Sequence, residues 1–285
     1  MQRMLVAGAV GLFLVVPGTT QAGFEFTKID VPGAASTAAN GNSTTAIVGE
    51  FTDGDGDTHG FLLNKNGFTQ IDVPGAWLTR ANGVNAQGDI VGTYFDDPAH
   101  PSRRHGYILT KGVFTKIDVP DSLRTTAFFV NARKQVAGVY RDAHNVSHGF
   151  IWDDGEFTAI NVPDASLTSI IGINDVGEVA GVYADEDGLH GFVRSAKGDF
   201  TTLDVPDADD FTVSQGINDA GYVVGLYKDA TGTSHGFIYR KGAFTTVDVP
   251  GAHWTEIYSI GDDGAIVGAY EDATGVHGFI GTPAH

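Results

Sequence analysis

The sequence has 285 residues, 42% of them hydrophobic and 11% aromatic, which supplies a sizeable core and excludes a disordered chain. It contains no cysteine, so disulfide bonds, thiolate metal sites and a cysteine nucleophile are excluded as well. The formal net charge of −18 repels phosphate backbones, and we therefore expect no nucleic-acid partner.

The first 22 residues have the pattern of a secretory signal peptide. Arg3 supplies the positive start, residues 5–16 are apolar, and Thr20 and Ala22 are the small residues of a cleavage site. The apolar run is too short for a comfortable membrane span, so we expect export, cleavage and no membrane insertion of the mature chain. The sequence thus predicts a bacterial protein of the periplasm or the extracellular medium, with residues 23–285 as a single monomeric domain.

A repeat of 42 to 46 residues dominates the rest of the chain. Its first marker is Asp-Val-Pro, with Asn replacing Asp in one copy, at Asp30, Asp72, Asp118, Asn161, Asp204 and Asp248. Its second marker is His-Gly-Phe or His-Gly-Tyr, at His59, His105, His148, His190, His235 and His277. Between them lies a glycine followed two residues later by an aromatic residue, as in "VVGLY". The chain therefore contains six copies of one unit.

Each copy divides into four short strands separated by turn residues. In the fifth copy the expected strands are residues 211–218, 222–227, 235–240 and 243–250, which are rich in Val, Ile, Thr, Phe and Tyr. No segment keeps a helical period over three turns, so the predicted class is all-β. Four strands in each of six units predict a six-bladed β-propeller; the alternative, a β-solenoid, would need shorter coils.

The first copy of the Asp-Val-Pro segment stands alone at the front of the chain, and the last repeat stops after its third strand. We therefore expect residues 24–32 and 253–285 to form one composite blade, with the N-terminal strand pairing beside the C-terminal "HGFIG" and closing the ring. Closure would remove two sheet edges that otherwise favour aggregation. Burial of Phe26, Ile29 and Val31 would stabilise it.

The recurring proline and histidine residues have structural interpretations. Proline cannot donate a hydrogen bond to a strand ladder, so the proline of each Asp-Val-Pro segment should end the fourth strand. One histidine per blade leaves the six imidazoles too far apart to share a zinc ion. We expect each imidazole to hydrogen-bond within its own hairpin, with Asp142, Asp185, Asp229 and Asp272 as candidate partners.

One loop differs from its equivalents in the other copies. The segment "FTDGDGDTHGF" places Asp53, Asp55 and Asp57 at alternate positions, and three oxygen donors on a tight loop suit Ca²⁺. No glutamate follows at the bidentate position, so a solvated acidic turn is the alternative. Calcium is the only cofactor that the sequence suggests.

The repeated "IDVPGA", "GIN" and "HGF" segments carry a resemblance that covers about 260 residues, from Phe24 to the end. They resemble the extracellular repeats, often called HAF repeats, of bacterial secreted proteins. That resemblance implies an exported, propeller-like protein, and it implies no catalytic motif. The copies depart from the pattern at residues 130–134, "VNARK", and 259–264, "SIGDDG".

Residues that differ between the copies are the candidates for a ligand site. We label the strands of a blade a to d from the inside outwards, so the d–a and b–c connections emerge on one face around the channel mouth. Aromatic residues for stacking and charged residues for orientation would suit a carbohydrate or a peptide there. The candidates are Trp77, Arg80, Arg103, Arg104, Arg124, His253, Trp254, Glu256 and Tyr258.

Three classes of function fit these observations. The sequence favours a secreted binding module for an extracellular glycan, peptide or protein, because repeats without a shared catalytic set suit recognition. A lyase or hydrolase at the channel mouth is the second class, with Glu256 and His253, or Asp209 and Asp210, as acid and base. No nucleophile elbow, metal-ligand triplet or cofactor loop supports it. The third class is a structural protein of the cell surface or matrix.

Overall fold

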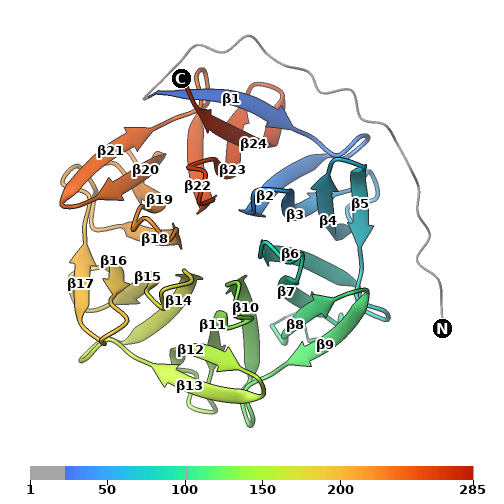
Figure 1. Cartoon of the computed structure of the whole chain (residues 1–285), viewed down its shortest axis with the longest axis horizontal. Helices are drawn as coiled ribbons and strands as arrows, with labels where there is room; N and C mark the ends of the chain where they lie inside the picture. The colour runs from blue at the N-terminus through green and yellow to red at the C-terminus, as the bar shows by residue number, and fades with distance from the viewer. Residues whose placement is uncertain (1–22, 101, 285) are drawn as a thin grey trace.

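Six four-stranded antiparallel sheets stand around a central axis in the computed structural model, which describes residues 23–100 and 102–284 (Figure 1). The chain is an all-β, six-bladed β-propeller, as predicted, and the described residues contain strands and turns but no helix. Accordingly, no helix in this part of the chain is long and apolar enough to cross a membrane. The predicted signal peptide, residues 1–22, lies outside the described residues.

Each blade has its strands in the order a-b-c-d from the axis outwards. The a strands are β2 (Ser36–Asn42), β6 (Leu78–Val84), β10 (Arg124–Val130), β14 (Leu167–Ile173), β18 (Thr212–Ile217) and β22 (Trp254–Ile260). The b strands are β3 (Ala46–Thr52), β7 (Ile90–Phe95), β11 (Val136–Arg141), β15 (Val179–Ala184), β19 (Val223–Lys228) and β23 (Ile266–Asp272). The c strands are β4 (Thr58–Asn64), β8 (His105–Thr110), β12 (Ser147–Asp153), β16 (Leu189–Arg194), β20 (Ser234–Arg240) and β24 (Gly275–Pro283). The d strands are β5 (Gly67–Ile71), β9 (Val113–Ile117), β13 (Glu156–Ile160), β17 (Phe200–Leu203), β21 (Ala243–Val247) and β1 (Phe24–Ile29).

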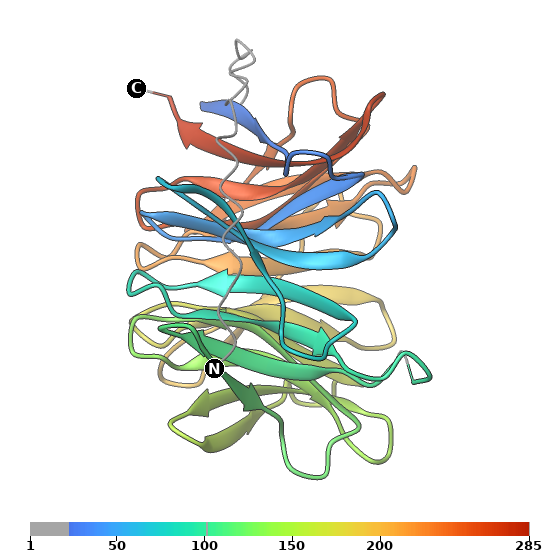
Figure 2. The same cartoon turned by 90° about the vertical axis from the view of Figure 1, so that its right-hand side faces the viewer.

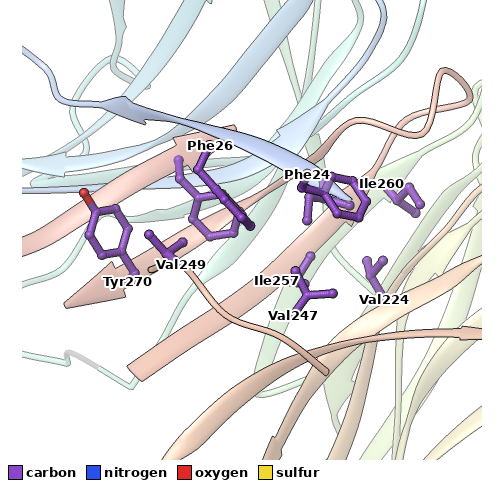
Figure 3. Packing of buried hydrophobic residues seen from close by; sticks show 10 residues of the cluster. Phe24, Phe26, Val224, Val247, Val249, Ile257, Ile260 and Tyr270 are labelled. Carbon is purple, nitrogen blue, oxygen red and sulfur yellow. The ribbon is translucent and has the colours of Figure 1, made fainter. Parts of the chain in front are cut away.

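The predicted composite blade is confirmed. Strand β1 pairs antiparallel with β24, from Phe24 opposite Pro283 to Ile29 opposite Gly278. Phe24 and Phe26 are buried in one cluster with residues of the fifth and sixth blades, among them Val224 (Figure 3). The Phe26 ring meets the Phe279 ring edge-on, with centroids 5.6 Å apart. The first strand of the chain is therefore the outermost strand of the last blade.

The hydrophobic core lies within and between the blades. The aromatic residue of each His-Gly-Phe or His-Gly-Tyr segment is fully buried: Phe61, Tyr107, Phe150, Phe192, Phe237 and Phe279. The glycine of strand b leaves room for this ring, because a Cβ on Gly225 would lie 2.0 Å from the carbonyl oxygen of Val213 and 2.9 Å from the Phe237 ring. The recurring glycine is therefore a packing requirement.

Buried asparagines connect successive blades at the a–b turns. The Nδ2 of Asn85 donates to the carbonyl oxygen of Asn131, which continues the chain to Asn174, Asn218 and Gly261 over 3.1 to 3.2 Å at each step. The segment "VNARK", which departs from the repeat pattern, still supplies Asn131 to this series of hydrogen bonds, whereas "SIGDDG" supplies only the backbone carbonyl of Gly261. Amide side chains thus satisfy backbone carbonyls that the blades bury between them.

A substitution in β1 tests the closure of the ring directly. We expect Phe26→Ala to lower stability by about 3–5 kcal/mol, the usual cost of removing a buried phenylalanine, and to cause aggregation because it loosens the closing strand. The matched control is Phe157→Ala: Phe157 holds the same place in β13, where its ring meets Phe150 at 5.5 Å, but β13 is tied to β12 by a short hairpin. Thermal melting and light scattering measure both effects. Equal aggregation of the two variants would contradict a special role for closure.

Candidate functional site

The strand directions place the d–a and b–c connections on one face of the disc, which we call the loop face. Within each blade the four strands alternate in direction, so the loop face carries the starts of the a and c strands and the ends of the b and d strands. Figure 2 shows the disc from the side, with connections projecting from both faces. Most of the predicted site residues lie at or near this face because they belong to these connections or to the first half of an a strand, whereas Tyr258 lies further along β22.

A β-bulge in every a strand directs one residue into the central channel. The strand register shifts at the same place in all six blades, for example between Ala39 and Gly41 in β2. A bulge re-aims the side chain of the extra residue. The six bulged residues are Asn40, Asn82, Phe128, Ile171, Gln215 and Tyr258, and all of them line one cavity of about 240 Å³.

Two polar pairs occupy one side of this cavity. Nε of Arg80, in β6, lies 2.8 Å from Oε2 of Glu50, in β3. In the last blade, the hydroxyl of Tyr258 donates to Oε2 of Glu256 over 2.8 Å. Burial raises the pKa of Glu50 and outweighs the opposing effect of the Arg80 charge. Burial and the neighbouring Glu256 and Glu50 carboxylates raise the pKa of Tyr258 in the same way.

Apolar side chains of the third and fourth blades, Phe128, Phe129 and Ile171, line another part of the cavity. Val182, Val213 and Leu226, from the fourth and fifth blades, form a buried cluster. Ile171 and Tyr258, which also line the cavity, pack against it. The cavity lining is therefore amphipathic, with the charged Glu50 and Arg80 on the first and second blades and the apolar Phe128, Phe129 and Ile171 on the third and fourth.

An arginine cluster lies where the second and third blades meet at the channel mouth. Arg104 precedes β8, Arg124 begins β10 and Arg141 ends β11, opposite Arg124. The carbonyl oxygen of Arg104 accepts a hydrogen bond from the amide of Thr125 over 3.0 Å, which ties the loop to the next blade. Burial, together with the charges of Arg124, Arg80 and Arg141, lowers the pKa of Arg104 to about 10.

The structure brings only part of the predicted site together. Arg80, Glu256 and Tyr258 belong to the channel, and Arg104 and Arg124 to its rim, whereas Arg103 and His253 are exposed. Trp77 is 40% exposed and packs against Phe95, with ring centroids 5.6 Å apart. Trp254 is half-buried, and its Nε1 donates to Glu271 Oε2 over 2.9 Å.

Sequence reasoning missed Glu50 and Arg141. Glu50 follows the recurring glycine of strand b, where the other copies have Thr93, Val139, Val182, Leu226 and Ala269. A charged residue at a position that is small or apolar in the other five copies was the feature of the sequence that could have identified Glu50 as a site residue. Arg141 was equally visible as the only arginine directly after the aromatic residue of strand b.

The recurring histidines sit between two acidic or amide side chains, and the predicted aspartate partners are confirmed. Nε2 lies near the loop aspartate, at 3.0 Å for His190 and Asp185, and at 3.2 to 3.4 Å for the other three predicted pairs. The Nδ1 atom contacts the Asp or Asn of the Asp-Val-Pro segment in every blade, as in His235 and Asp248 at 2.9 Å. The aspartate of the Asp-Val-Pro segment therefore lies just after the end of strand d and also holds the histidine of strand c in place. In the composite blade this contact joins His277 to Asp30 across the ring closure.

The predicted calcium loop is a compact turn. Oδ1 of Asp53 accepts hydrogen bonds from the amides of Asp55 and Asp57, at 2.9 and 3.0 Å, and Asp53 also lies 3.5 Å from His59. Within the described residues no group of three or more His, Cys, Asp or Glu side chains is arranged to hold a metal ion. Calcium binding here stays an untested prediction.

The sequence matches no protein-family model and no curated protein sequence. Among solved structures the chain is similar to TolB from Acinetobacter baumannii, with a TM-score of 0.59 and 8% identity over 85% of this chain and 64% of that one. A streptogramin B lyase gives a TM-score of 0.53 and 12% identity over 91% and 99% of the two chains. The propeller domain of the Trilobed protease from Pyrococcus furiosus gives a TM-score of 0.53 and 10% sequence identity, and the match covers 88% of this chain and 96% of that one. Similarity at these identities shows the β-propeller fold alone, and the relation to HAF repeats stays a prediction.

The histidine contacts predict how stability changes with pH. Burial lowers the pKa values of His59, His190 and His235, but their aspartate partners raise them further, to a net value above the usual 6.5. Such a group stabilises the fold fully below pH 6.5, and the contribution is lost as the pH rises through the raised pKa. The loop partners Asp53, Asp185 and Asp229 have lowered pKa values, so their contribution is lost only as the pH falls below 3.8.

We therefore expect the melting temperature to be highest between about pH 4 and 6.5 and to fall from pH 6.5 to 8.5. His235→Gln should flatten this fall. The control is His253→Gln, because His253 is exposed and forms no ion pair within residues 23–100 and 102–284. Calorimetry in buffers of constant ionic strength measures the profiles. A melting temperature that rises above pH 6.5 would refute the histidine contribution.

Proposed function

We propose that this protein is an exported binding module that recognises carbohydrate or peptide at the channel mouth on its loop face. The amphipathic channel carries the proposal: a single cavity of about 240 Å³ brings an Arg80–Glu50 ion pair close to the apolar side chains of Phe128 and Ile171. Ligand sites combine apolar walls with a few placed polar groups in this way. Six similar blades supply a rigid ring, and the residues that differ between blades are concentrated where a ligand would be distinguished.

The ion pair offers a clean test of the channel. Removing Arg80 alone would leave Glu50 unpaired inside the molecule, so the double variant Glu50→Gln/Arg80→Gln is the better choice. We expect glycan and peptide arrays to give hits with the wild-type protein that weaken about tenfold or more in the double variant. The control Arg194→Gln removes an arginine that ends β16 on the opposite face and lies over the Phe200 ring. An empty array, or hits that the double variant keeps, would contradict the proposal.

A lyase or hydrolase is the second candidate, and the raised pKa of Glu50 favours it. A carboxylate whose pKa moves toward neutrality, at the wall of a cavity, suits a general base. The neighbouring Tyr258 hydroxyl, bonded to Glu256, would be a second group for proton transfer. His253, one of the acid–base candidates from the sequence, is exposed and not part of the cavity lining.

Turnover separates the two functions. If the protein is a binding module, polysaccharides, peptides and esters incubated with it should remain intact by mass spectrometry. If it is an enzyme, products should form, and Glu50→Gln should reduce their rate by about a hundredfold or more, while ligand binding is kept. The matched variant is Gln215→Glu, which adds a carboxyl group at another cavity position and should not substitute for Glu50.

A further inference from the structure

Four guanidinium groups gather between the channel and the rim, on two adjacent blades. Arg80 lines the cavity from β6, and Arg104, Arg124 and Arg141 lie at the junction with the third blade. They lie close enough to affect one another, because burial and then the charges of Arg124, Arg80 and Arg141 lower the pKa of Arg104. Burial and the charge of Arg141 lower the pKa of Arg124 as well. Like charges are therefore held together in a partly desolvated place.

Protein carboxylates do not neutralise this cluster. Glu50 pairs with Arg80, but among the described residues no Asp or Glu forms an ion pair with Arg104, Arg124 or Arg141. The Nε atoms of Arg104 and Arg141 are buried without a hydrogen-bond partner. Arg141 makes one side-chain hydrogen bond, from Nη1 to Asn145 Oδ1 over 2.8 Å. Buried polar groups are ordinarily satisfied, so buried guanidinium nitrogens without a partner carry a cost in free energy.

The cluster is unusual for this molecule, whose formal net charge is −18. Among the described residues three lysines have acidic partners, Lys28 with Asp30 at 3.0 Å, Lys116 with Asp118 at 2.8 Å and Lys134 with Asp89 at 3.4 Å, and the cations without one are mostly exposed, such as Arg103 and Lys111. Thirty-five acidic residues were available to supply partners, yet three arginines at the rim have none within ion-pair distance. A concentration of unpaired guanidinium groups at the mouth of a cavity marks a place where a ligand supplies the negative charge.

We propose that Arg104, Arg124 and Arg141 bind an oxyanion, a carboxylate or a sulfate ester, carried by the ligand of the channel. This inference rests on the proposed binding function and specifies the chemistry of its ligand. The planar guanidinium fork suits the paired oxygens of such groups. The remainder of the ligand extends into the cavity, toward the apolar side chains of Phe128 and Ile171. Because the protein as a whole repels anions, a ligand with one or two negative groups fits better than a continuous polyanion.

The experiment compares ligands that differ only in one group. Isothermal titration calorimetry would measure the affinity of the protein for three probes: a neutral trisaccharide, the same trisaccharide with one uronic acid, and the same trisaccharide with one sulfate ester. A tripeptide with one aspartate and its asparagine counterpart supply the peptide arm. We expect one anionic probe to bind at least about tenfold more tightly than its neutral counterpart.

The arginines are tested with a double variant and a charge-matched control. Arg104→Gln/Arg124→Gln removes two rim charges, and we expect it to abolish the preference for the anionic probe. Arg194→Gln/Arg240→Gln removes two charges at the ends of β16 and β20, on the opposite face, and should keep the preference. Thermal melting confirms that both variants are folded, and Arg124→Lys replaces the double variant if it fails to fold.

The outcomes separate this inference from the proposed function. Anionic probes that bind the wild type and the control, but not the rim variant, support both. If neutral probes bind as tightly as anionic ones and the rim variant binds them equally well, the oxyanion site is refuted while the binding function stands. If both double variants lose affinity equally, the effect is one of net charge and the site is refuted. If no probe binds, both proposals fail.

Discussion

Pairing between β1 and β24 is the constraint on which the ring depends. Without β1, the last blade would have three strands and expose the backbone groups of β24 as an open edge. The pairing also places Phe24 and Phe26 in the cluster shared by the fifth and sixth blades. Asp30 then reaches His277, so the closing strand carries the same histidine contact as every other blade. Six equivalent units around one axis are what allow the channel to have a defined shape.

The channel acquires its chemistry from a departure from regular strand geometry. In each a strand, the bulged residue faces the axis, and its successor is small in five blades, as with Gly216. A Cβ on Gly83 would lie 2.7 Å from the carbonyl oxygen of Phe128, so close packing of neighbouring a strands requires the glycine. The scaffold therefore requires a small residue after the bulge in five of the six blades and leaves the bulged position itself free. That freedom allows six similar repeats to present side chains of five different types to one cavity.

The architecture was predictable because its signals are repeated. Six copies of a strand terminator, a histidine hairpin and a glycine-aromatic segment identify the blades, and the isolated copy at Phe24 identifies the closure. The site was predictable only in part, because its members each occur once. Arg80 and Tyr258 were found as variable residues near an a strand, but the position of Glu50 on strand b says nothing of which way its side chain points. In the a strands the β-bulges set which side chains point into the channel. The bulged residues are as different as Asn40, Phe128 and Tyr258, so their residue types do not predict a bulge. Likewise, the charge of Arg141 matters only because the fold brings it near Arg104 and Arg124.

Closure by the first strand also has a consequence for how the chain folds. Phe24 and Pro283 are partners, so the contact that completes the ring spans nearly the whole sequence and forms only after the last residues are available. Contacts of such long range are slow to form, because the intervening loop must lose its entropy first. The hairpins of the first five blades are local and can form earlier. A chain made from its N-terminus holds β1 without a partner until β24 has been made, and the ring can close only from that point on.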